Sequence, residues 1–417
     1  MRETWFDIAA TTAAKVYWLA AGLVITFVTA RVLGPDGRGV FAAATAWVTL
    51  FSTIGYLSLP QAVIHRAATQ RSTSWVAETA GTLVTIYSIV TLAGGGVAAV
   101  LYRASGGDAF DHLPGRVLVV AFLTMPFMLW FETGNALLLS IGALRLSNVA
   151  QLAGATLSMI AVLVCVGALG WGVMGALLAP LAYYGLYAVV TVGVLLSRAG
   201  IARPAMATAR WFLASGLKLH LNAVGAYLVS GAHVLIVNAF RTPADTAYIQ
   251  LALQLLTAMQ ILPMAAATVA SSIIAREGSD RAWRRHRTLL VTLLSIMIVA
   301  IPIVYTLAPW LIRLIAGPEF GPAVPLFRVA LCAVPGMTVS VLMAPQWIAR
   351  GYFLTTAAIT TALGLASVAG SWIWVPRHGT IAAAWVVVGV YWTSLAVNTG
   401  FFFFVNLAAR RSSSMEP

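Results

Sequence analysis

The sequence predicts an all-α polytopic membrane protein, with about twelve transmembrane helices in two pseudo-symmetric six-helix bundles. Three observations predict this fold class: the composition, a series of apolar segments, and an approximate internal repeat. Hydrophobic residues make up 60% of the 417 residues and charged residues only 9%, and the mean hydropathy is +0.91. Soluble domains contain about 25% charged residues, so the composition excludes an ordinary soluble protein.

The chain contains twelve apolar segments, each with the length of about 20 residues that a helix needs to cross a bilayer. In order, they are residues 11–33, 40–64, 77–102, 117–140, 147–169, 172–197, 214–239, 246–275, 288–315, 322–348, 353–375 and 380–407. The connections between them are short. None is long enough to form a separate globular domain, which excludes catalysis by an appended soluble unit.

An approximate repeat relates the two halves of the chain. Residues 34–41 follow the first apolar segment, and residues 242–249 follow the seventh in a similar way. Pro35 and Pro243, one in each connection, are 208 residues apart. The period is therefore close to half the length of the chain.

Each half of the repeat contains six apolar segments, so both halves enter the membrane with the same orientation. Parallel repeats of this kind are typical of transporters, which place the substrate path at the interface between the repeats. We predict an N-terminal six-helix bundle over residues 1–205 and a C-terminal six-helix bundle over residues 206–417.

The charge of the chain indicates membrane topology rather than nucleic-acid binding. The sequence has 25 Lys and Arg against 12 Asp and Glu, a net charge of +13, but the basic residues are scattered between the apolar segments. With a cytoplasmic N-terminus, 17 of the 25 fall on the cytoplasmic side and 8 on the outer side, as the positive-inside rule requires. We therefore predict a multi-pass protein of the cytoplasmic membrane with both termini in the cytoplasm. Its basic residues would contact anionic lipids, and no nucleic acid is expected as a partner.

The sequence contains none of the common motifs for catalysis, for metal binding or for cofactor binding. Gly94-Gly95-Gly96 lacks the Lys and the Ser or Thr of a phosphate-binding loop and favours close helix packing or bending instead. Cys165 and Cys332 lie in apolar segments, so we expect buried packing residues rather than a disulfide or a metal site. The prediction is therefore a protein that is not an enzyme, whose cargo moves down its own gradient or is coupled to an ion.

Glu132 is the only acidic residue deep in an apolar segment. A charge there costs at least about 2.5 kcal/mol, so each one that occurs is a candidate for a water-filled cavity. Asn135 lies one helical turn further on in the same segment. Three interpretations of Glu132 stay open: a proton or cation partner, an acidic group lining the cavity, or a structural ion pair with a neighbouring Arg.

Other polar residues in the spans are candidates for the same pathway, although hydrogen bonding between helices also explains such residues. Gln250 and Gln254 are four residues apart, which places them on one helix face. Arg31 and Arg350 lie at segment ends, where they either extend to the interface or contact an anionic phosphate. The complete set of candidates for the substrate or ion pathway is Arg31, Glu132, Asn135, Asn222, His233, Asn238, Gln250, Gln254 and Arg350.

Three short stretches resemble a known family. Residues 30–41 read Ala-Arg-Val-Leu-Gly-Pro-Asp-Gly-Arg-Gly-Val-Phe. They resemble the opening signature of the Wzx-type polysaccharide flippases, a branch of the multidrug, oligosaccharidyl-lipid and polysaccharide (MOP) exporter superfamily. Residues 317–328 resemble the family's entry into its tenth span, and residues 346–351 resemble the exit from that span. In span count and in its two halves, the similarity covers nearly the whole chain.

The resemblance implies a V-shaped pair of six-helix bundles, like that of the MATE transporters, which opens alternately to the two sides. Such a carrier moves a lipid-linked oligosaccharide of the polyprenyl pyrophosphate type from the cytoplasmic to the outer leaflet, and works with envelope glycan-assembly proteins. Arg31 and Arg350 would then contact the lipid phosphates. The sequence departs from the family in having only two lysines, Lys15 and Lys218. It also departs from the lipid II flippases, because it does not show their two additional C-terminal spans.

Three alternatives stay open at this point. The first is an ion-coupled multidrug exporter of the same superfamily. The second is an integral-membrane glycan polymerase or ligase, which needs a sizeable outer loop, whereas the longest outer connection here, residues 103–116, is short. The third is a membrane scaffold that transports nothing.

Overall fold

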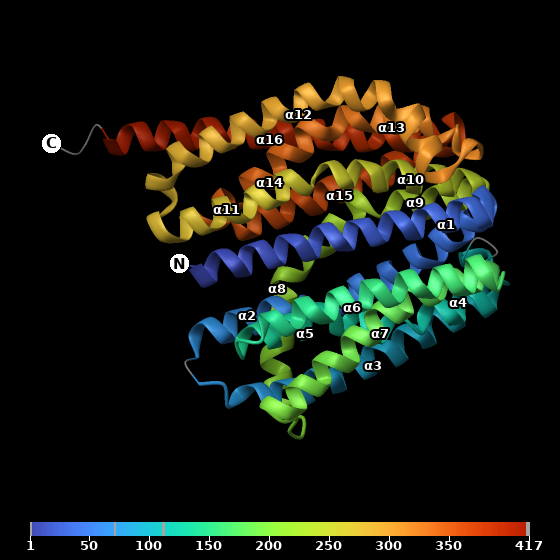
Figure 1. The fold of residues 1–417 in the computed structure, drawn as a ribbon. Helices are drawn as coiled ribbons and strands as arrows, with labels where there is room; N and C mark the ends of the chain where they lie inside the picture. The colour runs from blue at the N-terminus through green and yellow to red at the C-terminus, as the bar shows by residue number, and fades with distance from the viewer. Residues whose placement is uncertain (1, 71, 111–112, 414–417) are drawn as a thin grey trace. The chain divides into compact units, whose positions relative to one another are not determined.

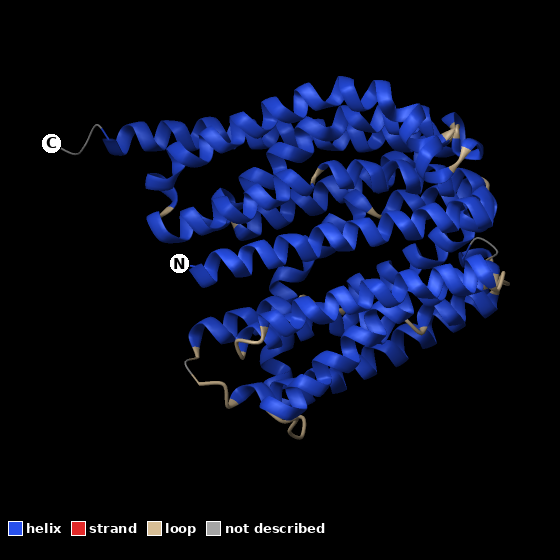
Figure 2. Cartoon of the chain, viewed as in Figure 1, coloured by secondary structure: helices blue, strands red, loops and turns tan. Residues whose placement is uncertain are grey.

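The computed structural model describes residues 2–70, 72–110 and 113–413. Figure 2 shows helices joined by short loops, and these residues contain no strand. Helices are expected because the bilayer interior cannot hydrogen-bond an open backbone, so each spanning segment must satisfy its own amides and carbonyls. The predicted all-α fold class is confirmed.

The elements carry the labels of Figure 1, where α marks an α-helix, η1, η3 and η4 are short 3₁₀ helices and η2 is a π-helix. In chain order they are α1 (Arg2–Gly55), α2 (Leu59–Thr69), α3 (Trp75–Ala104), η1 (Asp108–Phe110), α4 (Gly115–Phe122), α5 (Met125–Ser140), α6 (Leu144–Val162), η2 (Leu163–Ala168), α7 (Gly172–Arg198), α8 (Met206–Ser230), α9 (Ala232–Phe240), α10 (Pro243–Met259), α11 (Ile261–Glu277), α12 (Ser279–Ala316), η3 (Pro318–Phe320), α13 (Ala323–Ala330), η4 (Leu331–Ala333), α14 (Val334–Ala349), α15 (Phe353–His378) and α16 (Thr380–Ser413).

Eight helices of the described chain are long and apolar enough to cross a membrane, or up to eleven if each of three bent pairs forms one span. Gly34 divides α1 further, because its backbone has φ 64° and ψ −177° between two helices. If these two helices are counted as separate spans, the number reaches the predicted twelve. The count of twelve spans stays a prediction. Large apolar side chains cover the outer surface, among them Leu92 at 77% and Leu354 at 75% exposure, as expected for helices that face lipid.

The described chain divides into two compact units. The first consists of Met1–Val224 with the short segments Thr242–Ala247 and Ile315–Glu319. In it α6 packs along α7 and against α1, while α5 packs against α7. The close approach of α6 to α7 needs Gly154, where a Cβ atom would lie 2.9 Å from the Tyr183 carbonyl oxygen.

The second unit consists of Gly225–Arg241, Tyr248–Leu314 and Phe320–Pro417. In it α14 packs against α11 and α16, and α15 packs against α9 and α16. Trp347 stacks on Phe401 with ring centroids 3.6 Å apart. The predicted bundle boundary between residues 205 and 206 stays a prediction.

Within the first unit, the two connections that the repeat relates lie against each other. A Cβ atom at Gly39 would lie 1.7 Å from the carbonyl oxygen of Pro243, so only glycine fits there. Arg38 is 2% exposed and hydrogen-bonds to Thr29 Oγ1. The helix resumes directly after Gly34 and turns the Arg38 side chain inward. The predicted position of this connection on the outer side of the membrane stays a prediction.

The expectation of two buried cysteines is wrong. Cys332 is exposed and Cys165 is half-buried. In a membrane protein the outward face of a helix is as apolar as its inward face, so an apolar run does not distinguish a buried residue from a residue at the lipid surface.

Candidate functional site

Glu132 and Asn135 lie three residues apart on α5 and therefore share a face of this helix. α5 begins directly after Thr124, with Pro126 in its first turn, where proline is tolerated because no helical partner is lost. Glu132 is exposed and Asn135 is half-buried. The carboxylate is thus accessible in the middle of an apolar helix.

A hydrogen-bonded chain connects Asn135 to the two neighbouring helices. The Ser147 hydroxyl on α6 donates to Asn135 Oδ1 at 2.7 Å and lies 2.9 Å from the Tyr187 hydroxyl on α7. Gln151 Nε2 donates to the same Ser147 oxygen at 3.3 Å. Polar groups on α5, α6 and α7 therefore meet inside the first unit, and their partners offset much of the cost of burying them.

Three tyrosines on α7 lie within electrostatic range of Glu132. The phenol groups of Tyr183, Tyr184 and Tyr187 all interact electrostatically with its carboxylate. On α3, the Tyr87 hydroxyl interacts with the same carboxylate and lies 2.6 Å from Thr133 Oγ1. We call the group formed by Glu132, Asn135, Ser147, Tyr87, Gln151, Tyr183, Tyr184 and Tyr187 the α5–α7 polar cluster.

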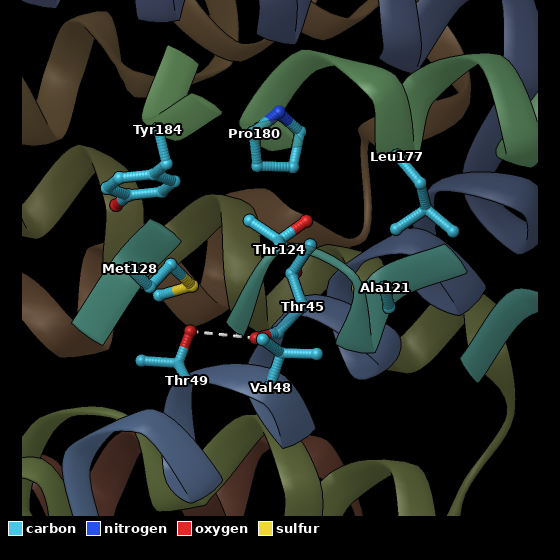
Figure 3. Close-up of a pocket in the computed structure, with 9 residues that line it drawn as sticks. All are labelled: Thr45, Val48, Thr49, Ala121, Thr124, Met128, Leu177, Pro180 and Tyr184. Carbon is cyan, nitrogen blue, oxygen red and sulfur yellow. Dashed lines mark hydrogen bonds between the residues drawn. The ribbon is translucent and has the colours of Figure 1, made fainter. Parts of the chain in front are cut away.

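A cavity of about 150 Å³ adjoins this cluster. Figure 3 shows its lining, in which Tyr184 also belongs to the polar cluster. Thr124 is 2% exposed, and its hydroxyl has no hydrogen-bond partner among the described residues. Thr49 Oγ1 donates to the Thr45 carbonyl at 2.7 Å. A cavity of this size with several hydroxyl groups can hold a few water molecules or a small cation.

Pro180 lines the same cavity from within α7. A proline in a helix interior removes the hydrogen bond to the carbonyl four residues earlier, here that of Ala176. The backbone of α7 is therefore weakened at the level of the cavity, where a helix can bend.

Arg31 also lies in the first unit, one turn before the break at Gly34. It is exposed, and its guanidinium lies 4.4 Å from the centre of the Phe27 ring. Asn222, on α8, is exposed.

The candidates of the second unit have structural partners. His233 is 1% exposed, and its ring nitrogens lie 2.9 Å from Ser371 Oγ and 3.1 Å from Ser367 Oγ. Asn238 is 8% exposed. On α10, Gln250 Nε2 donates to Gln254 Oε1 at 3.4 Å, so the predicted common face is observed.

Arg350 follows α14 and forms an ion pair with Asp280 at 2.5 Å. Its Nε also donates to Gln346 Oε1 at 3.3 Å. The Arg350 side chain is 14% exposed and that of Asp280 is 62% exposed. A place for Arg350 on the substrate path, like those of the other candidates, stays a prediction.

The structure thus brings together Glu132 and Asn135, and adds residues that the sequence prediction does not contain. The spacing of Tyr183, Tyr184 and Tyr187 on one helix is the signal that could have indicated them. Among the described residues, no group of His, Cys, Asp and Glu is arranged to hold a metal ion.

No protein-family model and no curated protein sequence matches the chain. Solved structures do. An inward-facing multidrug resistance MATE family transporter of the MOP superfamily is 14% identical, with a TM-score of 0.75 over 96% of each chain. The lipid II flippase MurJ in an inward closed conformation is 12% identical, with a TM-score of 0.78 over 96% of this chain and 90% of MurJ.

A third similar structure is a MOP superfamily transporter from Pyrococcus furiosus, 13% identical, with a TM-score of 0.65 over 97% of this chain and 95% of the other. At these identities the likeness shows the fold alone. The chain therefore has the fold of multi-pass membrane transporters of the MOP superfamily, a class that includes multidrug exporters and a lipid flippase.

Proposed function

We propose that the chain is a flippase that moves a lipid-linked oligosaccharide across the cytoplasmic membrane by alternating access. The observation that carries the proposal is the likeness to the lipid II flippase over nearly the whole chain. The resemblance of residues 30–41 to the polysaccharide flippase signature supports the same substrate class.

In this proposal the α5–α7 polar cluster couples transport to a proton or another cation. Glu132 supplies the negative charge, and the hydroxyls of Tyr184 and Thr124 supply oxygen ligands or proton relays through the adjoining cavity. Such a group in a span is costly, and polar residues at that depth usually serve a transport path. Binding and release of the cation would favour one of the two openings, because a ligand shifts a conformational equilibrium by its differential affinity.

Arg31 serves as a contact for the lipid phosphate in this proposal. Its charge is exposed and lies at the end of a span, which is where the pyrophosphate of a lipid-linked saccharide would lie as it crosses the interface. The proposed topology has both termini in the cytoplasm, which places Arg31 on the outer side, where the cargo is released.

Deletion in the host tests the proposal. We expect the deletion strain to lose a surface polysaccharide, with unchanged sensitivity to cationic drugs, and expression of the chain to restore the polysaccharide. The reverse result, normal polysaccharide with increased drug sensitivity, would establish the multidrug exporter that the MATE likeness also favours.

A reconstituted assay gives the direct measurement. Purified protein in vesicles should move a short pyrophosphate-linked saccharide between leaflets, scored by its accessibility to an external glycosidase. The Arg31→Ala variant should flip this substrate more slowly. A variant of Arg377, which lies between the eleventh and twelfth apolar segments and therefore has a predicted outer position, should match the wild type.

A further inference from the structure

A groove of about 460 Å³ runs between α3 and α4 in the first unit. The residues that line it recur every three or four positions on each helix, so each helix contributes one stripe. Next to the groove, Leu92 is 77% exposed and Val100 is 66% exposed. Because α3 is a spanning helix, this side of it faces lipid and the groove opens into the bilayer.

The groove is about as long as one leaflet of the bilayer is thick. Its lining on α3 extends from Thr91 to Arg103, which at 1.5 Å per residue corresponds to roughly 18 Å along the helix. Half of the hydrocarbon thickness of a bilayer is about 15 Å. A single acyl chain that stands in one leaflet therefore matches the groove in length.

One end of the groove is polar and positively charged. Tyr102 and Arg103 lie there, in the last turn of α3. The Arg103 side chain makes no hydrogen bond or ion pair with the residues that the structure describes, and it is exposed. Toward the other end, Gly95, Val119 and Phe122 make the lining apolar. This arrangement complements a lipid with an apolar chain and a negatively charged headgroup.

We propose that this groove binds an acyl chain of an anionic glycerophospholipid, whose phosphate contacts Arg103 and Tyr102. With the predicted cytoplasmic termini, Arg103 lies at the outer surface, so the lipid belongs to the outer leaflet. The inference does not depend on the cargo, because the groove lies outside the α5–α7 polar cluster and involves none of its residues.

Two glycines provide a steric test with a matched control. A Cβ atom at Gly95 or at Gly96 would meet no atom within 4 Å, so both positions accept a side chain without a clash. Only Gly95 lines the groove. Gly95→Leu fills the groove, whereas Gly96→Leu adds the same side chain to the same helix outside it.

Arg103 and Arg198 provide a charge test in the same way. Each lies in the last turn of a spanning helix of the first unit, and both are exposed. Only Arg103 lines the groove. Arg103→Gln removes the charge from the groove, and Arg198→Gln removes a similar charge elsewhere.

The experiment uses the full chain in vesicles that contain phosphatidylglycerol or phosphatidylcholine with a photoactivatable diazirine in the acyl chain. Adducts are mapped by mass spectrometry of peptides. We expect adducts on the two groove stripes of the wild type. In Gly95→Leu the adduct yield should decrease roughly ten-fold, which corresponds to the displacement of about two methylene groups. Gly96→Leu should label like the wild type.

The headgroup is tested by the ratio of labelling with the two lipids. Because one Arg near the surface contributes about 1 kcal/mol toward an anionic lipid, phosphatidylglycerol should label about five-fold more strongly than phosphatidylcholine. Arg103→Gln should abolish this preference, and Arg198→Gln should keep it. The proposal is overturned if Gly95→Leu leaves the labelling unchanged or if the two lipids label equally. It is also overturned if a polyprenyl phosphate displaces the probe better than phosphatidylglycerol, because the groove would then belong to the carrier lipid.

Discussion

The hydroxyl group of Tyr187 on α7 lies 2.9 Å from the Ser147 hydroxyl on α6. Since Ser147 donates its own proton to Asn135 Oδ1, Tyr187 is the donor in this pair. Tyr187 and Ser147 are both fully buried. The two bonds give a directed chain of donors across three helices, which fixes the face that α5 presents to α7.

The Tyr187→Phe variant should lower the free energy of unfolding by about 1 to 2 kcal/mol, because a buried acceptor loses its donor. Tyr17 offers the control, since its hydroxyl also bonds to a side-chain hydroxyl on α6, that of Thr156 at 2.7 Å, but on the exposed surface. We expect a change of less than about 0.5 kcal/mol for Tyr17→Phe. The measurement is thermal unfolding in detergent. Equal decreases in the free energy of unfolding of the two variants would show that the buried chain of hydrogen bonds adds no stability.

The Glu132→Gln variant keeps the size of the side chain and removes its charge. If the α5–α7 polar cluster binds the coupling cation, the initial rate of flipping should decrease at least roughly ten-fold, which corresponds to about 1.4 kcal/mol. Glu277→Gln is the control, because Glu277 forms a surface ion pair with Arg285 at 2.6 Å and such pairs contribute little. An unchanged flipping rate in Glu132→Gln, at normal expression, would show that the carboxylate takes no part in the coupling mechanism.

The contact between Gly39 and Pro243 predicts a severe effect of a single methyl group. In Gly39→Ala the new Cβ atom would collide with the Pro243 carbonyl oxygen at 1.7 Å. Because the Cβ atom is fixed to its backbone and the oxygen is itself a backbone atom, neither can move aside alone, and a loss of about 3 kcal/mol or more is expected. Gly22→Ala, in the same helix α1, meets no atom within 4 Å. It should be neutral or stabilise by up to about 1 kcal/mol. Melting temperatures of the two variants check this, and a similar melting temperature for both would contradict the contact.

The helices and Glu132 could be predicted from the sequence for a physical reason. An apolar run of spanning length has few alternatives to a helix in a bilayer, and an acidic residue in such a run is too costly to be incidental. Tyr183, Tyr184 and Tyr187 could not be predicted as site residues in this way. The tyrosine ring is apolar enough to occur anywhere in a span, and only the packing of α7 against α5 brings the three hydroxyls within electrostatic range of the carboxylate.

Burial was the property that the sequence predicted least well. His233 has two interpretations in the sequence, a pathway residue or a packed core residue. Its contacts with Ser367 and Ser371 come from residues more than 130 positions away, which no local pattern contains. Cys332 is exposed although the sequence predicts a buried residue, because a uniformly apolar helix carries no signal for which face is turned inward.

The ion pair between Arg350 and Asp280 allows a last prediction that separates structure from transport. The guanidinium already contacts Asp280 at 2.5 Å and Gln346 at 3.3 Å. We therefore expect Arg350→Gln and Asp280→Asn to lower the melting temperature by similar small amounts, and the double variant to be no less stable than either. Because Asp280 is 62% exposed, the coupling energy should be about 0.5 to 1 kcal/mol. Flipping should stay within about two-fold of the wild type in all three variants, a difference worth less than about 0.5 kcal/mol. The contrary outcome is a loss of flipping in Arg350→Gln but not in Asp280→Asn, with equal melting temperatures for the two variants. It would assign the guanidinium to the cargo phosphate, because only that role distinguishes the two partners of the pair.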